Sequence, residues 1–161
     1  ATTSDNYREI MVKTLNILKD DGIETGIFGD IDFMPHLEWI QETCRMGGIE
    51  PVLPLWNRDQ DQIISEFLDA GFITLIIAVR ADVLGEEWLG RTLDRQFIED
   101  IKSLDKEITP CGEAGEFHSL VVDGPIFKNR LHIVEAAKVR RENHWFLDIR
   151  RCELVSKTGA K

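Results

Sequence analysis

The longest apolar run in the chain is Phe72-Ile73-Thr74-Leu75-Ile76-Ile77-Ala78-Val79. Its β-branched side chains favour a strand, and its nearly unbroken apolar character indicates a strand buried on both faces, as in a parallel sheet. The run is much too short to cross a bilayer, which takes about 20 apolar residues in a helix. We therefore expect it to lie inside a parallel sheet, and we predict no membrane partner.

Helical and strand patterns alternate in the residues before this run. Apolar residues at helical spacing, with capping or helix-ending residues at the borders, predict three helices with short strands between them. The helices begin near Asp5, Pro35 and Asp59, and the strands cover residues 24–28, 49–55 and 72–79. This order predicts an α/β fold with a parallel-sheet layer and right-handed crossovers over residues 1–82.

The pattern changes after Arg80. A helix is predicted at residues 94–104 and a strand at 117–122, followed by a long antiparallel hairpin of residues 130–139 and 145–155 that turns at Glu142-Asn143. We assign residues 83–161 to an α+β C-terminal portion.

The charge balance narrows the classes of partner. The net charge is −10, from 19 basic and 29 acidic side chains. Because a phosphate backbone is bound by clustered Lys and Arg, this balance argues against double-stranded nucleic acid. Basic residues gather most densely in the hairpin, at Lys138, Arg140, Arg141, Arg150 and Arg151. This cluster is either a solvated face or a surface through which the chain forms a homodimer.

The cysteines and the first residues bear on the compartment. Cys44, Cys111 and Cys152 are widely spaced and form no CxxC pair, so they give neither a zinc signature nor a disulfide framework. This is typical of the reducing cytoplasm, and no signal segment opens the sequence. We expect a cytoplasmic protein. Because the sequence starts at Ala1 without Met and soon becomes helical, we also expect it to be part of a longer chain.

Candidate binding residues follow the three predicted strands. Ligands of parallel α/β sheets bind beyond the carboxyl ends of the strands, where loops and helix N-termini meet. If the three strands are neighbours, their ends share one rim. The residues nominated on this rim are Asp30, Asp32, Trp56, Arg80 and Asp82.

These residues also have other interpretations. Asp30 or Asp32 could hold backbone amides before the next helix, or both could join His36 around a divalent ion. Trp56 could be a packing residue or stack on a base. Arg80 could form a structural ion pair or clamp a phosphate or carboxylate.

The densest signal is Thr109-Pro110-Cys111-Gly112-Glu113-Ala114-Gly115-Glu116-Phe117-His118-Ser119. Its glycines permit close backbone approach and its two carboxylates flank the turn, which suits holding an amine, a metal-bound phosphate or an activated acyl group. The alternative is a tight turn that leads into the next strand. His118 is a candidate acid or base, and Cys111 is a candidate nucleophile if a base lies within hydrogen-bond reach.

This loop opens a longer motif that continues as Leu120-Val121-Val122-Asp123-Gly124-Pro125-Ile126-Phe127. The stretch at 110–127 resembles the signature of the diphthine–ammonia ligase-like, N-type ATP-pyrophosphatases. Two upstream stretches are similar to further motifs of that family, and the resemblance covers residues 7–135. These stretches are Pro54-Leu55-Trp56 and Glu87-Trp88-Leu89-Gly90-Arg91.

The resemblance implies a nucleotide-binding half of the adenine nucleotide α-hydrolase type, joined to a smaller, substrate-side C-terminal portion. It implies a ligase that uses ATP and Mg²⁺ and cleaves ATP to AMP and pyrophosphate. A carboxylate acceptor is adenylated, and ammonia then displaces AMP to form an amide. The family's known acceptor in archaea and eukaryotes is the diphthine side chain of translation elongation factor 2.

The candidate site residues combine this resemblance with the strand ends. Glu113 and Glu116 are the candidate catalytic residues, which position the nucleophile or bind ammonium. The candidate substrate-binding residues are Gly112, Gly115 and His118, and the candidate nucleotide-binding residues are Gly29, Asp30, Trp56, Arg80 and Arg91. We assign no protein ligand to a metal.

One family feature does not occur in these 161 residues: the Ser-Gly-Gly-x-Asp-Ser loop, whose backbone amides bind phosphates at a helix N-terminus. We therefore expect these residues by themselves to lack ATP cleavage. The competing interpretation is a non-catalytic module that binds a nucleotide or a partner, or that assembles through the basic hairpin.

Overall fold

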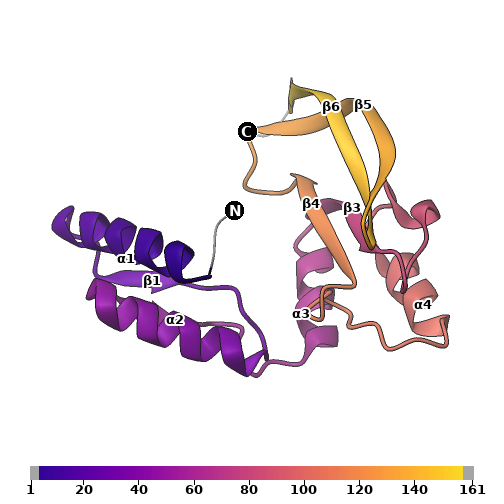
Figure 1. The fold of residues 1–161 in the computed structure, drawn as a ribbon. Helices are drawn as coiled ribbons and strands as arrows, with labels where there is room; N and C mark the ends of the chain where they lie inside the picture. The colour runs from indigo at the N-terminus through magenta and orange to yellow at the C-terminus, as the bar shows by residue number, and fades with distance from the viewer. Residues whose placement is uncertain (1–3, 158–161) are drawn as a thin grey trace. The chain divides into compact units, whose positions relative to one another are not determined.

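The computed structural model describes residues 4–157. The chain forms two compact units, residues 1–58 and residues 59–161 (Figure 1). Together the helices, one parallel sheet and one antiparallel sheet confirm the predicted α/β fold class. The two compact units meet between Arg58 and Asp59, whereas the domain boundary placed after residue 82 stays a prediction.

The first unit combines two helices with a short parallel sheet. β1 and β2 run parallel, with Thr25 opposite Glu50 and Ile27 opposite Val52, which confirms the parallel pairing predicted here. The elements are α1 Ser4–Asp20, β1 Thr25–Ile27, α2 Met34–Gly47 and β2 Glu50–Val52. The buried core of the unit consists of Leu15, Ile40, Cys44 and Ile49.

Local signals fix the ends of α2 and its distance from α1. Pro35 stands in the first turn of α2, where a backbone amide has no partner within the helix. Gly48 ends the helix in the left-handed conformation, with a φ of 66°. A Cβ at Gly47 would lie 2.6 Å from the Cβ of Leu15, so the glycine allows the two helices to approach closely.

The second unit combines helices with a four-stranded antiparallel sheet. Its strand order is β4-β3-β6-β5. Side chains from the helices and the sheet share one core, in which Ile76 and Phe97 have no exposed surface. The elements are α3 Gln60–Asp69, β3 Ile73–Arg80, the 3₁₀ helix η1 Glu86–Trp88, α4 Arg95–Ser103, β4 Phe117–Asp123, β5 Asn129–Arg141 and β6 His144–Ser156.

The apolar run at 72–79 lies in the middle of this antiparallel sheet, so the parallel sheet predicted for it is wrong. β3 pairs with β4 on one side and β6 on the other, and both pairings are antiparallel. Ile76 is fully buried, while Leu75 and Ile77, which alternate with it, are half-buried. The apolar run therefore indicates that both faces of the strand are covered. It does not indicate whether the neighbouring strands run parallel or antiparallel to it.

The long hairpin predicted near the end of the chain is confirmed. β5 and β6 pair from Asn129 opposite Ser156 to Arg141 opposite His144. The chain turns at Glu142, whose φ of 52° lies in the left-handed region that tight hairpin turns use. The start of α3 predicted at Asp59 is confirmed, because its side chain accepts a hydrogen bond from the Gln62 amide. Asp94 caps α4 in the same way, whereas α1 begins at Ser4 and so already includes Asp5.

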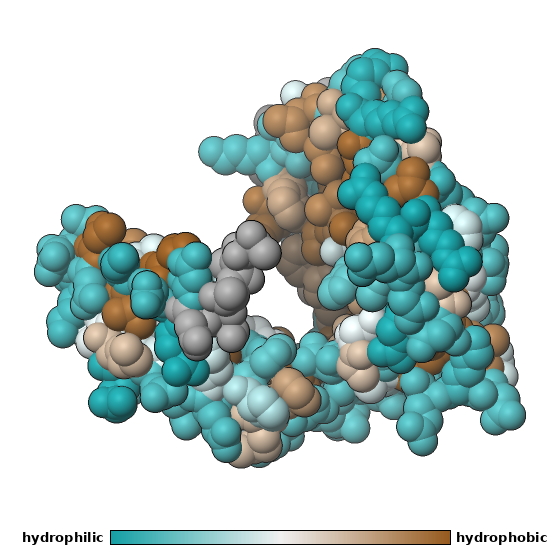
Figure 2. All heavy atoms as spheres, viewed as in Figure 1, coloured by the Kyte–Doolittle hydropathy of each residue, from teal (hydrophilic) through white to brown (hydrophobic). Residues whose placement is uncertain are grey.

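Hydrophilic side chains cover most of the face shown in Figure 2, with apolar atoms between them. Among the described residues, the most exposed large apolar side chains are those of Ile126, Ile27 and Leu154. Between Ser4 and Lys157, none of the helices has the length and hydrophobicity needed to span a membrane.

Candidate functional site

The segment before β4, residues 109–116, folds into two consecutive turns, and we call it the glycine loop. The Gly112 amide donates to the carbonyl of Thr109 at 3.1 Å, and the Gly115 amide donates to the carbonyl of Gly112 at 3.0 Å. Both glycines are left-handed, with φ of 74° and 75°. Glu113 and Ala114 therefore occupy the two central positions of the second turn.

Gly112 has no room for a side chain. A Cβ there would lie 2.8 Å from the carbonyl oxygen of Phe117 and 3.2 Å from a carbon of its ring. Nothing lies within 4 Å of a Cβ built on Gly115, so this position requires glycine only for its backbone conformation. The close backbone approach indicated by the sequence is therefore present at Gly112.

Glu116 closes the glycine loop from inside the protein. Its side chain has 0% exposed surface. Its carboxylate accepts hydrogen bonds from the Thr109 amide at 2.6 Å and from the Thr109 hydroxyl at 3.1 Å. Its backbone carbonyl accepts from the amide of Arg80 at 2.9 Å, which ties the loop to the end of β3. Glu113, the other candidate catalytic residue, is half-buried.

The side chain of Arg80 joins the end of β3 to the glycine loop and the hairpin turn. Its Nη1 donates to the carbonyl of Ala114 at 3.0 Å, and its Nε donates to Oδ1 of Asp82 at 3.0 Å. Asn143 in the hairpin turn donates to the same carboxylate oxygen at 3.1 Å, and its carbonyl accepts from the amide of Ala81 at 2.8 Å. Partial desolvation raises the pKa of Asp82, but a backbone hydrogen bond and Arg80 leave it below its ordinary value.

His118 and Cys111 lie at the borders of this cluster. His118 is exposed on β4, where it pairs with Ala78. The thiol of Cys111 donates to the backbone carbonyl of Gln60 at 3.5 Å, and its amide donates to the side-chain oxygen of Gln60 at 3.2 Å. Cys111 thus holds the glycine loop at the start of α3, and substrate binding by His118 stays a prediction.

Arg91 belongs to a different cluster within the second unit. Its guanidinium donates to Asp100 and lies over the ring of Trp88, 4.5 Å from the centroid. This hydrogen bond is the first cause that lowers the pKa of Asp100. Arg91 therefore connects the end of η1 to α4, and its contact with a phosphate stays a prediction.

In the first unit, the loops after β1 and β2 lie side by side. The amide of Asn57 donates to the carbonyl of Ile31 at 2.7 Å. This brings the segment of Gly29 and Asp30 next to that of Trp56, as predicted for the carboxyl ends of parallel strands. Asp30 and Trp56 are both half-buried, whereas Gly29 is exposed.

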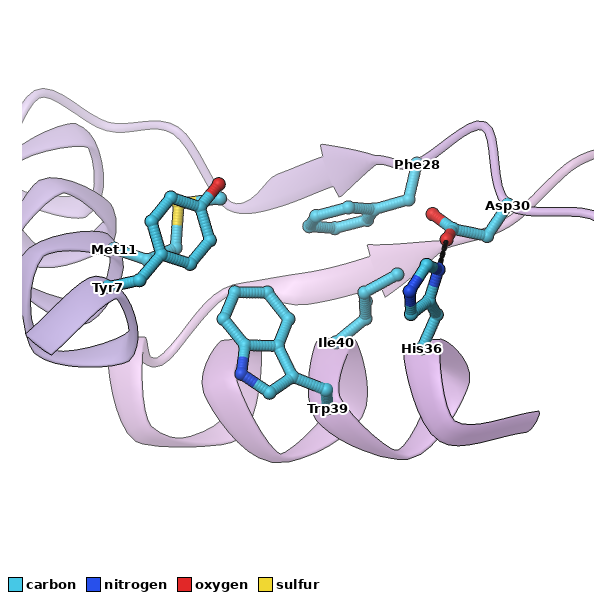
Figure 3. Close-up of a pocket in the computed structure, with 7 residues that line it drawn as sticks. All are labelled: Tyr7, Met11, Phe28, Asp30, His36, Trp39 and Ile40. Atoms are coloured by element: carbon cyan, nitrogen blue, oxygen red, sulfur yellow. Dashed lines mark hydrogen bonds and ion pairs between the residues drawn. The ribbon is translucent and has the colours of Figure 1, made fainter. Parts of the chain in front are cut away.

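Asp30 also lines a pocket of about 430 Å³ within the first unit (Figure 3). At one end, Oδ1 of Asp30 lies 3.0 Å from Nδ1 of His36. The remaining wall is aromatic and apolar, which suits a flat ring whose N–H groups reach the carboxylate. The lining residues are Tyr7, Met11, Phe28, Asp30, His36, Trp39 and Ile40.

Two expectations for the strand ends need correction. Arg80 and Asp82 do not share a sheet edge with the first two strand ends, because β3 belongs to the antiparallel sheet. The divalent-ion interpretation of Asp30, Asp32 and His36 finds no support, since no group of three or more His, Cys, Asp or Glu within residues 4–157 is placed to hold a metal ion.

Sequence reasoning included Thr109 in the loop and Asn143 in the hairpin turn, but it missed their contacts with Glu116 and Asp82. Thr109 is the partner of Glu116, seven residues away, and the only local signal was its place before Pro110. Asn143 is an ordinary turn residue in the sequence, so its bond to Asp82 could be seen only once the hairpin was placed beside β3.

The family comparison matches the unit that carries this loop. The family model of the diphthamide synthase C-terminal domain matches residues 59–155. The chain therefore belongs to the diphthamide synthase family, and the resemblance recognised in the sequence is confirmed. The matched region begins at Asp59, where the second compact unit also begins.

Several similar proteins are named diphthine–ammonia ligase. That of Schizosaccharomyces pombe is 28% identical over 154 residues, which cover 93% of this chain and 25% of the relative. The human protein is 31% identical over 104 residues, which cover 62% of this chain and 38% of the relative. The Saccharomyces cerevisiae protein is 26% identical, with 84% of this chain and 23% of the relative covered. The chain thus spans well under half the length of these relatives.

Proposed function

We propose that this chain supplies the acceptor-side loop and part of the nucleotide site of an ATP-dependent carboxylate–ammonia ligase. The observation that carries the proposal is that the family match coincides with the compact unit that holds the glycine loop. Because the relatives are named for diphthine, we propose a carboxylate of the diphthine type as the acceptor. The free cysteines fit the reducing cytoplasm in which we propose that it acts.

The proposed reaction has two steps. A carboxylate oxygen of the acceptor attacks the α-phosphorus of ATP, which forms an acyl adenylate and releases pyrophosphate. Ammonia then attacks the acyl carbon, so that the C–N bond forms, the bond to AMP breaks, and nitrogen loses one proton. Glu113, half-buried at the centre of the second turn, orients the ammonia and accepts that proton.

We propose that ATP is contacted in the first unit by Gly29, Asp30 and Trp56. The aromatic pocket beside Asp30 suits a purine, whose exocyclic amino group can donate to the carboxylate. Mg²⁺ would arrive on the nucleotide phosphates, since the described residues offer no group of three ligands for it. Arg80, whose donors reach Ala114 and Asp82, would act on the shape of the glycine loop.

The proposal is tested in the protein expressed from its complete gene. Amide formation is measured with Mg-ATP, ammonium and a diphthine-bearing acceptor. Glu113→Gln should lower the rate by roughly 10²–10⁴-fold, the usual contribution of a general base. The matched control is Glu107→Gln, an exposed carboxylate just before the glycine loop, which should leave the rate unchanged. A Glu113→Gln enzyme with the full rate would refute the role of Glu113.

The 161 residues by themselves should release no pyrophosphate from Mg-ATP, because they contain no Ser-Gly-Gly-x-Asp-Ser loop. A coupled pyrophosphate assay tests this directly. Steady turnover above the blank would show that the phosphates are held by residues outside that motif.

One observation favours assembly as a second function of the hairpin. β5 ends the strand order of its sheet, and Leu154 on β6 is 72% exposed. An unpaired edge and an exposed apolar side chain suit pairing with a second copy of the chain. Light scattering at low protein concentration distinguishes a monomer from a homodimer. A strict monomer would contradict assembly through the hairpin.

A further inference from the structure

We propose that Glu116 is a positioning residue: from inside the protein it fixes the start of the glycine loop and thereby sets Glu113, and it does not itself meet the substrate. This inference rests on the proposed function, in which Glu113 faces the ammonia. The inference gives Glu113 and Glu116 different roles, although their positions in the sequence do not distinguish them.

The contacts of Glu116 all point into the protein. The side chain has no exposed surface, and each carboxylate oxygen accepts a hydrogen bond from Thr109, one from the amide at 2.6 Å and one from the hydroxyl at 3.1 Å. A buried carboxylate persists only where hydrogen bonds replace its lost hydration. The geometry therefore accounts for Glu116 completely without a ligand.

Glu116 also connects the two ends of the loop to the sheet. Its side chain holds Thr109 at the first position of the loop, while its carbonyl accepts from the amide of Arg80 at 2.9 Å. Arg80 in turn donates from its side chain to Ala114, the residue after Glu113. The loop residues on both sides of Glu113 are thus held by protein groups that do not depend on a substrate.

A glutamine at position 116 can still hydrogen-bond both groups of Thr109, with the direction of the bond to the hydroxyl reversed. Its amide oxygen can accept from the Thr109 amide, and its NH₂ group can donate to the Thr109 hydroxyl oxygen. Glutamine cannot serve as a base or as a charge beside a substrate. Glu116→Gln therefore separates a positioning role from a catalytic one, and Glu116→Ala removes both.

The experiment is a double-mutant cycle in the protein from the complete gene, with kcat/KM for the acceptor and for ammonium as readouts. Glu116→Ala should lower kcat/KM by roughly a hundredfold, which is the order of loss expected when a reacting group is displaced by about 1 Å. Glu116→Gln should stay within a few-fold of the parent. In the Glu113→Gln background, Glu116→Ala should cost almost nothing more, because Glu116 acts only through Glu113.

Amide hydrogen exchange gives a readout that is independent of activity. Protection of the Thr109 amide should be lost in Glu116→Ala and kept in Glu116→Gln. If Glu116→Ala fails to fold, Thr109→Val and Thr109→Ser replace it. Valine keeps the shape of the side chain without the hydroxyl donor and should lower kcat/KM, whereas serine keeps the donor and should not.

Two outcomes separate this inference from the proposed function. If Glu116→Gln keeps the protection of Thr109 but loses as much activity as Glu113→Gln, Glu116 meets the substrate and the positioning role is overturned while the ligase function stands. If Glu113→Gln keeps the full rate, the proposed function fails, whatever Glu116 does.

Discussion

Gly112→Ala is expected to destabilise the second unit more strongly than Gly115→Ala, although both glycines have nearly the same φ. Placing an L-residue in the left-handed region costs about 1–2 kcal/mol, and this cost applies to both. At Gly112 the new Cβ also lies 2.8 Å from the Phe117 carbonyl and 3.2 Å from its ring. Backbone cannot yield as a flexible side chain does, so we expect a further cost of about 1–3 kcal/mol.

The assay is native-state hydrogen exchange of amides in β3, which reports the free energy of opening this unit separately from the first one. Ile76 and Val79 are suitable probes, since their side chains have no exposed surface. Gly115→Ala is the control, because nothing lies within 4 Å of its Cβ. Equal losses of opening free energy in the two variants would refute the argument that Gly112 is required by close backbone approach.

Three further predictions concern parts of the fold away from the glycine loop. Asp94→Ala removes the cap of α4 and should cost the second unit about 1 kcal/mol in the same exchange measurement. Gly47→Ala should destabilise the first unit by roughly 1–3 kcal/mol, read from α2 amides, because its Cβ would lie 2.6 Å from that of Leu15. The pKa of Asp123 is lowered, first of all by a hydrogen bond from Lys157. The ionised carboxylate therefore stabilises the fold at a pH above its unfolded pKa of about 3.9, and this stabilisation is lost as the pH falls through the lower folded pKa. The difference in unfolding free energy between Asp123→Asn and the parent should therefore shrink below about pH 4 in denaturant titrations, and a difference that does not change with pH would contradict this pairing.

The local structure could be predicted from the sequence because its causes are local. Within a helix a proline fits best in the first turn, where Pro35 stands, and Asp59 caps the helix whose first turn follows it. The hairpin followed from two long alternating segments around Glu142, where the turn was placed correctly. Each of these signals acts over a few residues, so no knowledge of tertiary contacts was needed.

The direction of β3 could not be predicted because its cause is not local. The run around Ile76 has both faces covered, and strands of either direction can satisfy that pattern. The partners of β3 lie far along the chain, at Phe117 in β4 and at Phe146 in β6. The same distance explains why Arg80 was placed on the wrong rim: its side chain donates to Asp82 and to Ala114, which lies 34 residues further along the chain.

The glycine loop shows the same limit within a single motif. Sequence spacing marked Glu113 and Glu116 as a pair, and nothing in a three-residue interval says which carboxylate faces inward. The left-handed turns at Gly112 and Gly115 decide it, since they place Glu113 at the centre of a turn and return the chain so that Glu116 reaches Thr109. The conformation of the glycines thus decides which of the two carboxylates is buried.

The hydrogen bonds described for the glycine loop are made by groups of the second unit. Thr109 and Glu116 bond to each other within the loop, Arg80 and Phe117 contact it, and all four lie within the region matched by the family model. The core beneath it is built from residues of the same unit, with Phe117 packed against Phe97. The hydrogen bonds that shape the loop thus lie within this unit, whereas the candidate nucleotide residues around Asp30 belong to the first unit. Substitutions at Gly112 or Glu116 should then alter the use of acceptor and ammonia while leaving the affinity for the nucleotide base unchanged.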